Sequence, residues 1–229
     1  MNIAVIPARG GSKRIPRKNI KLFHGLPVIA YAIKAARETK IFDQIVVSTD
    51  DEEIAEIALS FGASVPWMRA KDLSDDYATT ISVMQDAVKK IQANLKGLES
   101  ICCIYPLTPL LEPSHLLQGL KILESDDWNY VFSGSKASKP PQRFFSLGKS
   151  KGVEMLFPEH EVTRTQDLVQ TYHDAGQFYW GRKFAWESGL PIFSSKSTII
   201  EIPEESAVDI DTPEDWYYAE ALFSLKNRQ

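Results

Sequence analysis

The chain lacks the features that define several large classes of protein. No apolar run approaches the roughly 18 residues that a membrane-spanning helix needs, and no basic segment followed by an apolar run marks a secretory signal. The 26 lysine and arginine residues are outnumbered by 30 aspartate and glutamate residues, so the chain has a net charge of −4 and not the broad basic surface of a nucleic-acid binder. We therefore expect a cytoplasmic protein that binds neither membranes nor nucleic acid.

Cysteine and histidine are scarce. The two cysteines, Cys102 and Cys103, are adjacent in an apolar run, so we expect inert buried thiols in preference to a vicinal disulfide. The four histidines do not have the spacing of metal ligands, which argues against zinc.

Two phosphate-binding fingerprints are absent as well. Neither the dinucleotide pattern G-x-G-x-x-G nor the pattern G-x-x-x-x-G-K-[ST] occurs in the sequence. The 229 residues are 44% hydrophobic and 24% charged, and they contain no internal repeat, which is typical of one globular domain. We predict a single domain over residues 1–229.

Strand and helix signals alternate along the first 133 residues. This alternation is typical of a three-layer, doubly wound α/β fold with a mainly parallel sheet. Residues 135–170 break the pattern, and we interpret them as an excursion that contacts a second subunit. The predicted strands are 2–7, 44–49, 64–67, 100–105, 130–133, 177–181 and 197–202, and the predicted helices are 27–39, 51–61, 79–95, 113–125 and one that starts at Thr212-Pro213.

The first strand leads directly into a loop rich in glycine and in positive charge. Gly10 and Gly11 would let backbone N–H groups approach an anion, and five cations between Arg9 and Lys18 would neutralise it. The loop also stands where open α/β sheets bind ligands, beyond the carboxyl end of a strand. The pattern indicates a phosphate site, and the alternative is a basic, solvated turn.

The run P-A-R-G-G-S-K, followed by K-N, resembles the first signature of the sugar-activating cytidylyltransferases. These enzymes make CMP-linked nonulosonic and related acid sugars from CTP. The resemblance implies that the loop binds the nucleotide through Ala8, Gly10, Gly11, Ser12 and Asn19. It also implies catalytic roles for Arg9, Lys13 and Lys18 at the departing pyrophosphate.

A second signal lies near the end of the chain, in Asp209-Ile210-Asp211. Residues i and i+2 of an extended segment point the same way, so the two carboxylates can converge. Oxygen ligands beside a triphosphate suit Mg²⁺, and Mn²⁺ is expected to substitute. The alternative is that Asp211 only caps the last helix. The D-I-D-T run resembles the metal-binding signature of the same family, which implies a catalytic role for Asp211.

The segment from Arg69 to Thr80 is a candidate for base recognition. A helix N-terminus with hydroxyl groups and a nearby guanidinium can bind a base or a phosphate, and the alternative is an ordinary capped surface helix. In the family this segment contacts cytidine, which implies that Arg69, Thr79 and Thr80 line the nucleotide pocket.

The predicted sugar site draws on three parts of the chain. Many relatives carry a glutamine where Tyr105 stands, so its absence argues against an ordinary N-acetylneuraminate enzyme. Arg164 matches an arginine that reaches the sugar carboxylate from the second subunit of a dimer. The resemblance also implies sugar contacts for Gln177 and Tyr179.

Together these motifs predict a homodimeric enzyme that converts CTP and a small acid sugar into CMP-sugar and pyrophosphate. S-D-D-Y-A-T-T, Y-P-L-T-P and Y-H-D-A-G-Q-F-Y-W most resemble the pseudaminic acid branch, whose products serve glycan biosynthesis such as flagellin glycosylation. The alternatives within the family are the synthetases of CMP-N-acetylneuraminate, CMP-legionaminate and CMP-Kdo. Outside it they are a nucleotide-sugar glycosyltransferase and a non-catalytic nucleotide-binding regulator.

Overall fold

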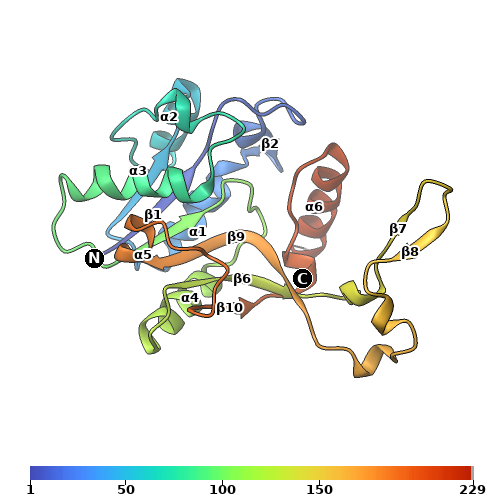
Figure 1. The fold of residues 1–229 in the computed structure, drawn as a ribbon. Coiled ribbons are helices and arrows are strands. Elements are labelled where there is room, and N and C mark those ends of the chain that lie inside the picture. The colour runs from blue at the N-terminus through green and yellow to red at the C-terminus, as the bar shows by residue number, and fades with distance from the viewer. Residues whose placement is uncertain (228–229) are drawn as a thin grey trace.

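A six-stranded sheet with the strand order β10-β6-β9-β5-β1-β4 forms the centre of the computed structural model, which describes residues 1–227 (Figure 1). Two pairs of short strands, β2–β3 and β7–β8, lie outside it. The strands are β1 (Asn2–Pro7), β2 (Leu22–Phe23), β3 (Leu26–Pro27), β4 (Gln44–Ser48), β5 (Ser100–Ile104), β6 (Tyr130–Lys136), β7 (Phe145–Leu147), β8 (Val153–Met155), β9 (Tyr172–Arg182) and β10 (Ser197–Glu201). The helices are α1 (Ile29–Thr39), α2 (Glu52–Ser60), α3 (Thr80–Gln92), α4 (Pro113–Ser125), α5 (Lys183–Glu187) and α6 (Pro213–Lys226).

The sheet is mainly parallel, as the alternation of strands and helices predicts. Strand β1 pairs in parallel with both β4 and β5, and β10 pairs in parallel with β6. Strand β9 is the exception, because it runs antiparallel between β5 and β6. The carboxyl ends of β1, β4 and β5 therefore meet at one edge of the sheet, which is where open α/β sheets place their ligands.

Helices cover both faces of the sheet. Ala4 and Ile6 of β1 join a buried cluster with α1, α2 and α4, whereas Ile3 and Val5 join a second cluster with α3 and α5. This alternation follows from the two-residue period of a strand and makes three layers. A third, smaller cluster packs α6 against β2, the start of α1 and the loop that follows β1.

Helix caps appear where the sequence predicts them. The Asp51 side chain accepts a hydrogen bond from the Ile54 N–H at 3.0 Å, and Thr79 accepts one from the Ser82 N–H at 3.1 Å. Thr212 and Asp215 cap α6 reciprocally, with Pro213 at the first helical position.

Two predicted elements differ from the structure. Residues 64–67 do not form a strand, because only single bridges, Val46 to Ser64 and Thr49 to Met68, flank a proline that has no N–H to donate. Helix α1 begins at Ile29 rather than Pro27, because Pro27 pairs with Leu22 across a tight turn. That turn holds two residues with positive φ, at His24 and Gly25, which suits a two-residue hairpin.

The segment between β6 and β9 comprises residues 137–171, because β6 continues to Lys136 and β9 begins at Tyr172. Between them the β7–β8 hairpin and short 3₁₀ turns project from the body of the protein (Figure 1). Within residues 1–227, no helix is long and apolar enough to cross a membrane. Several large apolar side chains of the excursion are exposed: Phe144, Phe145, Leu147, Val153, Leu156, Val162 and Val169.

Candidate active site

A cavity of about 410 Å³ opens at the carboxyl edge of β1 and β5. The loop after β1, the segment before α3, the turn after β5 and the segment before α6 all contribute to its walls. It brings together residues that are distant in sequence. Those of the predicted site residues that line it are Arg9, Ser12, Lys13, Lys18, Asn19, Arg69, Thr80, Tyr105, Asp209 and Asp211.

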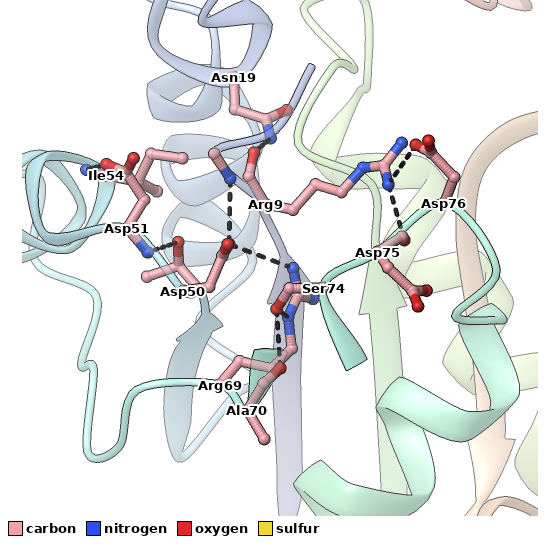
Figure 2. A network of polar contacts seen from close by, with 12 residues as sticks. Arg9, Asn19, Asp50, Asp51, Ile54, Arg69, Ala70, Ser74, Asp75 and Asp76 are labelled. Atoms are coloured by element: carbon pink, nitrogen blue, oxygen red, sulfur yellow. Dashed lines mark hydrogen bonds and ion pairs between the residues drawn. The ribbon is translucent and has the colours of Figure 1, made fainter. Parts of the chain in front are cut away.

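The loop after β1 is held in a defined shape by hydrogen bonds to its backbone. The buried Asn19 side chain donates to the Arg9 carbonyl at 2.8 Å, and the Gly10 N–H donates to an Asp50 carboxylate oxygen at 3.0 Å (Figure 2). Arg17 adopts a left-handed conformation, with φ of 54°, and pairs with Asp51 and Glu53 at the start of α2. The loop is therefore fastened to the end of β4, and the Gly10 N–H is already satisfied.

Two cations of the loop share one carboxylate. Asp76 lies 2.9 Å from the Arg9 guanidinium and 2.5 Å from the Lys13 ammonium, and these charges lower the pKa of Asp76. Arg9 also donates to the Asp75 carbonyl at 2.7 Å (Figure 2). The 75–76 segment thus occupies the cationic side of the cavity.

Lys18 and Arg14, two further cations of the cavity, form ion pairs with Asp211. Its carboxylate lies 3.1 Å from the Lys18 ammonium and 2.8 Å from the Arg14 guanidinium. Partial burial raises the pKa of Asp211, but the two cations outweigh burial and hold it below the usual value. The pKa of Asp209 is raised, because the cavity wall removes part of its hydration and Asp211 adds a like charge.

Arg69 is buried in the wall that the segment before α3 contributes to the cavity. Its side chain is only 3% exposed, and its Nε–H donates to the Ser74 hydroxyl at 3.1 Å. Burial lowers the pKa of the guanidinium, and the Asp50 carboxylate at 3.9 Å opposes that effect. Thr79 caps α3 from outside the cavity lining, so its neighbour Thr80 is the hydroxyl that the cavity wall presents.

Hydroxyl groups form the opposite wall. The Tyr105 and Thr80 hydroxyls are 2.7 Å apart, and burial raises the pKa of Tyr105 to about 12. The Tyr179 ring centroid is 5.3 Å from that of Tyr105, and its hydroxyl donates to Asp174 at 2.5 Å. Burial also raises the pKa of Tyr179. Tyr105 lines the cavity, so its neutral phenol can donate a hydrogen bond to a polar substrate.

Of the four residues predicted to contact the sugar, all but Tyr105 lie outside the cavity of their own chain. Gln177 is 2% exposed and donates to the Ser206 carbonyl at 2.6 Å, so its amide is directed away from a substrate. Tyr179 lies behind Tyr105 instead of lining the cavity. Arg164 projects from the excursion with a side chain that is 72% exposed, and it pairs with Asp167 at 2.8 Å.

Ala8 and the paired glycines make no side-chain contribution to the cavity lining. Ala8 is fully buried, and its N–H donates to the Ser48 carbonyl at 2.9 Å, which extends the pairing of β1 with β4. Gly11 has open space around the position that a Cβ would take. Ala8 and Gly11 could therefore contact a ligand only through their backbone atoms.

Four residues that the structure connects to the site were not among the predicted site residues, although Arg14 is one of the five loop cations. Arg14 and Asp76 line the cavity, whereas Asp50 and Asp174 stand behind it. The only signal available for Asp50 was its position directly after a predicted strand. The partners of Arg14 and Asp76, and the Gly10 N–H that Asp50 accepts, lie far away in sequence, so local patterns could not identify these three residues. Asp174 instead contacts the nearby Tyr179.

The carboxylates of the cavity offer a limited set of metal ligands. Among residues 1–227 no group of three or more histidine, cysteine, aspartate or glutamate side chains could hold a metal ion. Asp209 and Asp211 together supply oxygen donors only, which fits Mg²⁺, because Mg²⁺ takes one or two carboxylates and completes its shell with water and phosphate oxygens.

The sheet carries a cavity lined by cations at the carboxyl ends of its parallel strands, which is where α/β proteins bind anionic ligands. The model of the family described as "Cytidylyltransferase" matches residues 3–220, and the chain belongs to this family. It is a CTP-dependent cytidylyltransferase, as the sequence motifs predict, and not a glycosyltransferase or a non-catalytic regulator.

Similar proteins of known name cover nearly the whole chain. A pseudaminic acid cytidylyltransferase of Campylobacter jejuni subsp. jejuni serotype O:23/36 (strain 81-176) is 42% identical, over 99% of this chain and 97% of that protein. A CMP-N,N'-diacetyllegionaminic acid synthase of Legionella pneumophila is 32% identical, over 97% of this chain and 96% of that protein. The fold matches a structure of CMP:2-keto-3-deoxy-manno-octonic acid synthetase complexed with CTP, with a TM-score of 0.71, 17% identity and coverage of 98% of this chain and 99% of the other.

Proposed function

We propose that this enzyme transfers the cytidylyl group of CTP to pseudaminic acid, giving CMP-pseudaminic acid and pyrophosphate. The observation that carries the proposal is the single cavity in which the loop cations, Arg69, the hydroxyl wall and the 209–211 carboxylates converge. The choice of sugar is supported by the 42% identity to a pseudaminic acid cytidylyltransferase, against 32% for the legionaminic acid synthase.

In the proposed reaction the anomeric hydroxyl of the sugar attacks the α-phosphorus of CTP. A bond from that oxygen to phosphorus forms and the hydroxyl proton is released to solvent, while the bond to the β-phosphate oxygen breaks and pyrophosphate carries away the electron pair. Arg9 and Lys13 stand where they would offset the charge on the departing pyrophosphate, with Lys18 on the side of Asp211. Orientation and fixed charges are expected to supply most of the rate, as in other phosphoryl transfers.

Asp209 and Asp211 would hold Mg²⁺ beside the triphosphate. When bound, the ion would polarise the α-phosphoryl oxygen and lower the pKa of a bound hydroxyl. Lys18 and Arg14 keep Asp211 ionised and oriented toward the cavity, because both cations contact its carboxylate. Arg69 and Thr80 would recognise the cytosine end of the nucleotide, and Tyr105 would face the sugar.

We also propose that the active protein is a homodimer in which the excursion contacts the second subunit. The excursion projects from the sheet, and its apolar side chains, among them Phe145, Leu147 and Val153, are exposed in a single chain (Figure 1). Exposed apolar groups of this kind are typical of surfaces that a partner covers. Arg164 would then bind the sugar carboxylate at the partner's cavity, because its guanidinium does not line its own.

Pyrophosphate release tests the reaction. The purified protein is supplied with Mg²⁺ and each nucleoside triphosphate, together with pseudaminic acid, N,N'-diacetyllegionaminic acid, N-acetylneuraminic acid or Kdo. We expect release with CTP and the highest kcat/KM with pseudaminic acid. UTP should be rejected strongly, because a site that hydrogen-bonds the 4-amino group leaves polar groups unpaired against uracil.

The outcomes separate the parts of the proposal. A higher kcat/KM with another acid sugar would replace pseudaminic acid and leave the reaction class intact. Equal rates with CTP and UTP would remove base recognition from Arg69 and Thr80. Release of no pyrophosphate with any of the four sugars would overturn the proposed function.

A further inference from the structure

Asp50 stands between the phosphate loop and the buried arginine of the nucleotide segment. It follows β4 directly and precedes Asp51, the cap of α2. One of its carboxylate oxygens accepts the Gly10 N–H at 3.0 Å and lies 3.9 Å from the Arg69 guanidinium (Figure 2). Asp50 does not line the cavity, so it would reach a ligand only through these two neighbours.

The contact with Gly10 is close because that residue has no side chain. A Cβ at position 10 would lie 2.6 Å from a carboxylate oxygen of Asp51, which is nearer than real Cβ atoms come to other atoms. The loop backbone therefore packs directly on the 50–51 turn. Since Arg17 also pairs with Asp51, the loop is fastened to this turn at two points.

The contact with Arg69 compensates a buried charge. The Arg69 side chain is almost fully buried, and a buried cation without a counter-charge is costly. The charged groups that act on it are Asp50 and Asp86, which favour the cation, and Arg9, which opposes it. Asp50 is the carboxylate within ion-pair distance, so it balances Arg69 while it holds Gly10.

We propose that Asp50 is a positioning residue that couples the phosphate loop to the base-recognition arginine. One rigid carboxylate would fix the separation between the site of the triphosphate and the site of the cytosine, so that a nucleotide engages both ends together. This inference rests on the proposed function, because it takes the loop and Arg69 as the two ends of the CTP site.

The test compares Asp50→Asn and Asp50→Ala with Asp43→Asn and Asp43→Ala. Asp43 is a matched control, because its carboxylate accepts the Asn2 N–H at 2.8 Å near the opposite ends of β1 and β4. For each variant, thermal unfolding, the Kd of CTP and the ratio of kcat/KM for CTP over UTP are measured.

We expect Asp50→Ala to raise the Kd of CTP on the order of tenfold and to lower the CTP over UTP ratio, because it frees both ends of the site. Asp50→Asn keeps an acceptor for Gly10 and loses the charge facing Arg69, so it should weaken selectivity more than overall affinity. The Asp43 variants are expected to change the unfolding temperature alone.

The measurements distinguish a failure of the positioning role of Asp50 from a failure of the proposed function. A wild-type protein that does not bind CTP would overturn the proposed function and the inference with it. If the wild type binds CTP, then Asp50 variants whose Kd and selectivity stay within about twofold of wild type, or match those of the Asp43 variants, would overturn the positioning role alone. The isosteric Asp50→Asn variant carries the test if Asp50→Ala does not fold.

Discussion

Lys18 and Asp211 are 193 positions apart in the chain, and the Lys18 ammonium lies 3.1 Å from the Asp211 carboxylate. The same ammonium donates to the Ile210 carbonyl at 2.7 Å, so Lys18 holds both the backbone and the side chain of the 209–211 segment. Residues from the start and from the end of the domain therefore line the same cavity. A cation that binds Asp211 has to share this carboxylate with Lys18 and Arg14.

Asp211→Asn should abolish Mg²⁺-dependent turnover and leave the fold intact. The substitution removes the charge that pairs with Lys18 and that would hold the metal, and we expect the rate to fall at least about 10²-fold. Activity is measured as pyrophosphate release over a series of Mg²⁺ concentrations. The control is Asp127→Asn, whose carboxylate forms an exposed ion pair with Lys196 and does not line the cavity. Normal turnover with a normal Mg²⁺ requirement in Asp211→Asn would remove the metal assignment.

Lys13→Ala should lower kcat more than it weakens binding of CMP. Lys13 is expected to act on charge that grows on the leaving pyrophosphate, and CMP lacks the β- and γ-phosphates. Steady-state kinetics give kcat, and calorimetry gives the Kd of CMP, with the exposed Lys89→Ala on α3 as the control. If Lys13→Ala instead lost most of its affinity for CMP, Lys13 would belong at the α-phosphate or the nucleoside.

Asp76→Asn should tighten binding of CTP. The Asp76 carboxylate bridges Arg9 and Lys13, so it competes with phosphate oxygens for the same two cations and adds a repelling charge. Calorimetry should show a lower Kd for CTP, by about 2- to 10-fold, and a smaller change for CMP. Weaker binding of CTP in this variant would mean that Asp76 holds the two cations in their binding positions.

The fold was predictable where the signals are local. Thr79, Pro113 and Thr212 mark helix starts by their own chemistry, and continuous apolar runs mark the buried strands β1 and β5. The place of β9 in the sheet was not predictable, because its insertion between β5 and β6 depends on pairings between residues that are far apart in sequence. Its first three residues are exposed, so only its buried half produced a strand signal.

The sequence could predict which residue types form the site, but not where each side chain points or which group it contacts. The cations of the loop and the 209–211 carboxylates stand out as charged groups beside apolar strands. All of them line one cavity except Arg17, which pairs with Asp51 and Glu53. Gln177 was predicted from the resemblance to the family, yet its amide donates to the Ser206 carbonyl, a backbone group that no side-chain pattern reveals. Asp50 was missed for the same reason, because its partner is the Gly10 N–H.

Cys102 and Cys103 should not react with alkylating reagents in the folded protein. Both are fully buried, and burial raises the pKa of each thiol, so little reactive thiolate forms. We expect no labelling by iodoacetamide between pH 7 and 9, with two labels per chain in denaturant at the same pH, counted by mass spectrometry. Labelling of the native protein that increases with pH would show an accessible thiol.

Arg164 is expected to serve the active site of the second subunit, and complementation tests this. Arg164→Ala and Asp211→Ala are each expected to be inactive as homodimers. In a mixed dimer one site carries both changes and the other carries neither, if Arg164 acts across the interface. Since half of the dimers are mixed at full statistical exchange, activity should return to about a quarter of the wild-type value. Subunit exchange is measured by native mass spectrometry, which also shows whether the protein is a dimer. If exchange is complete and no activity returns, Arg164 serves its own chain, and the shared-site model is wrong.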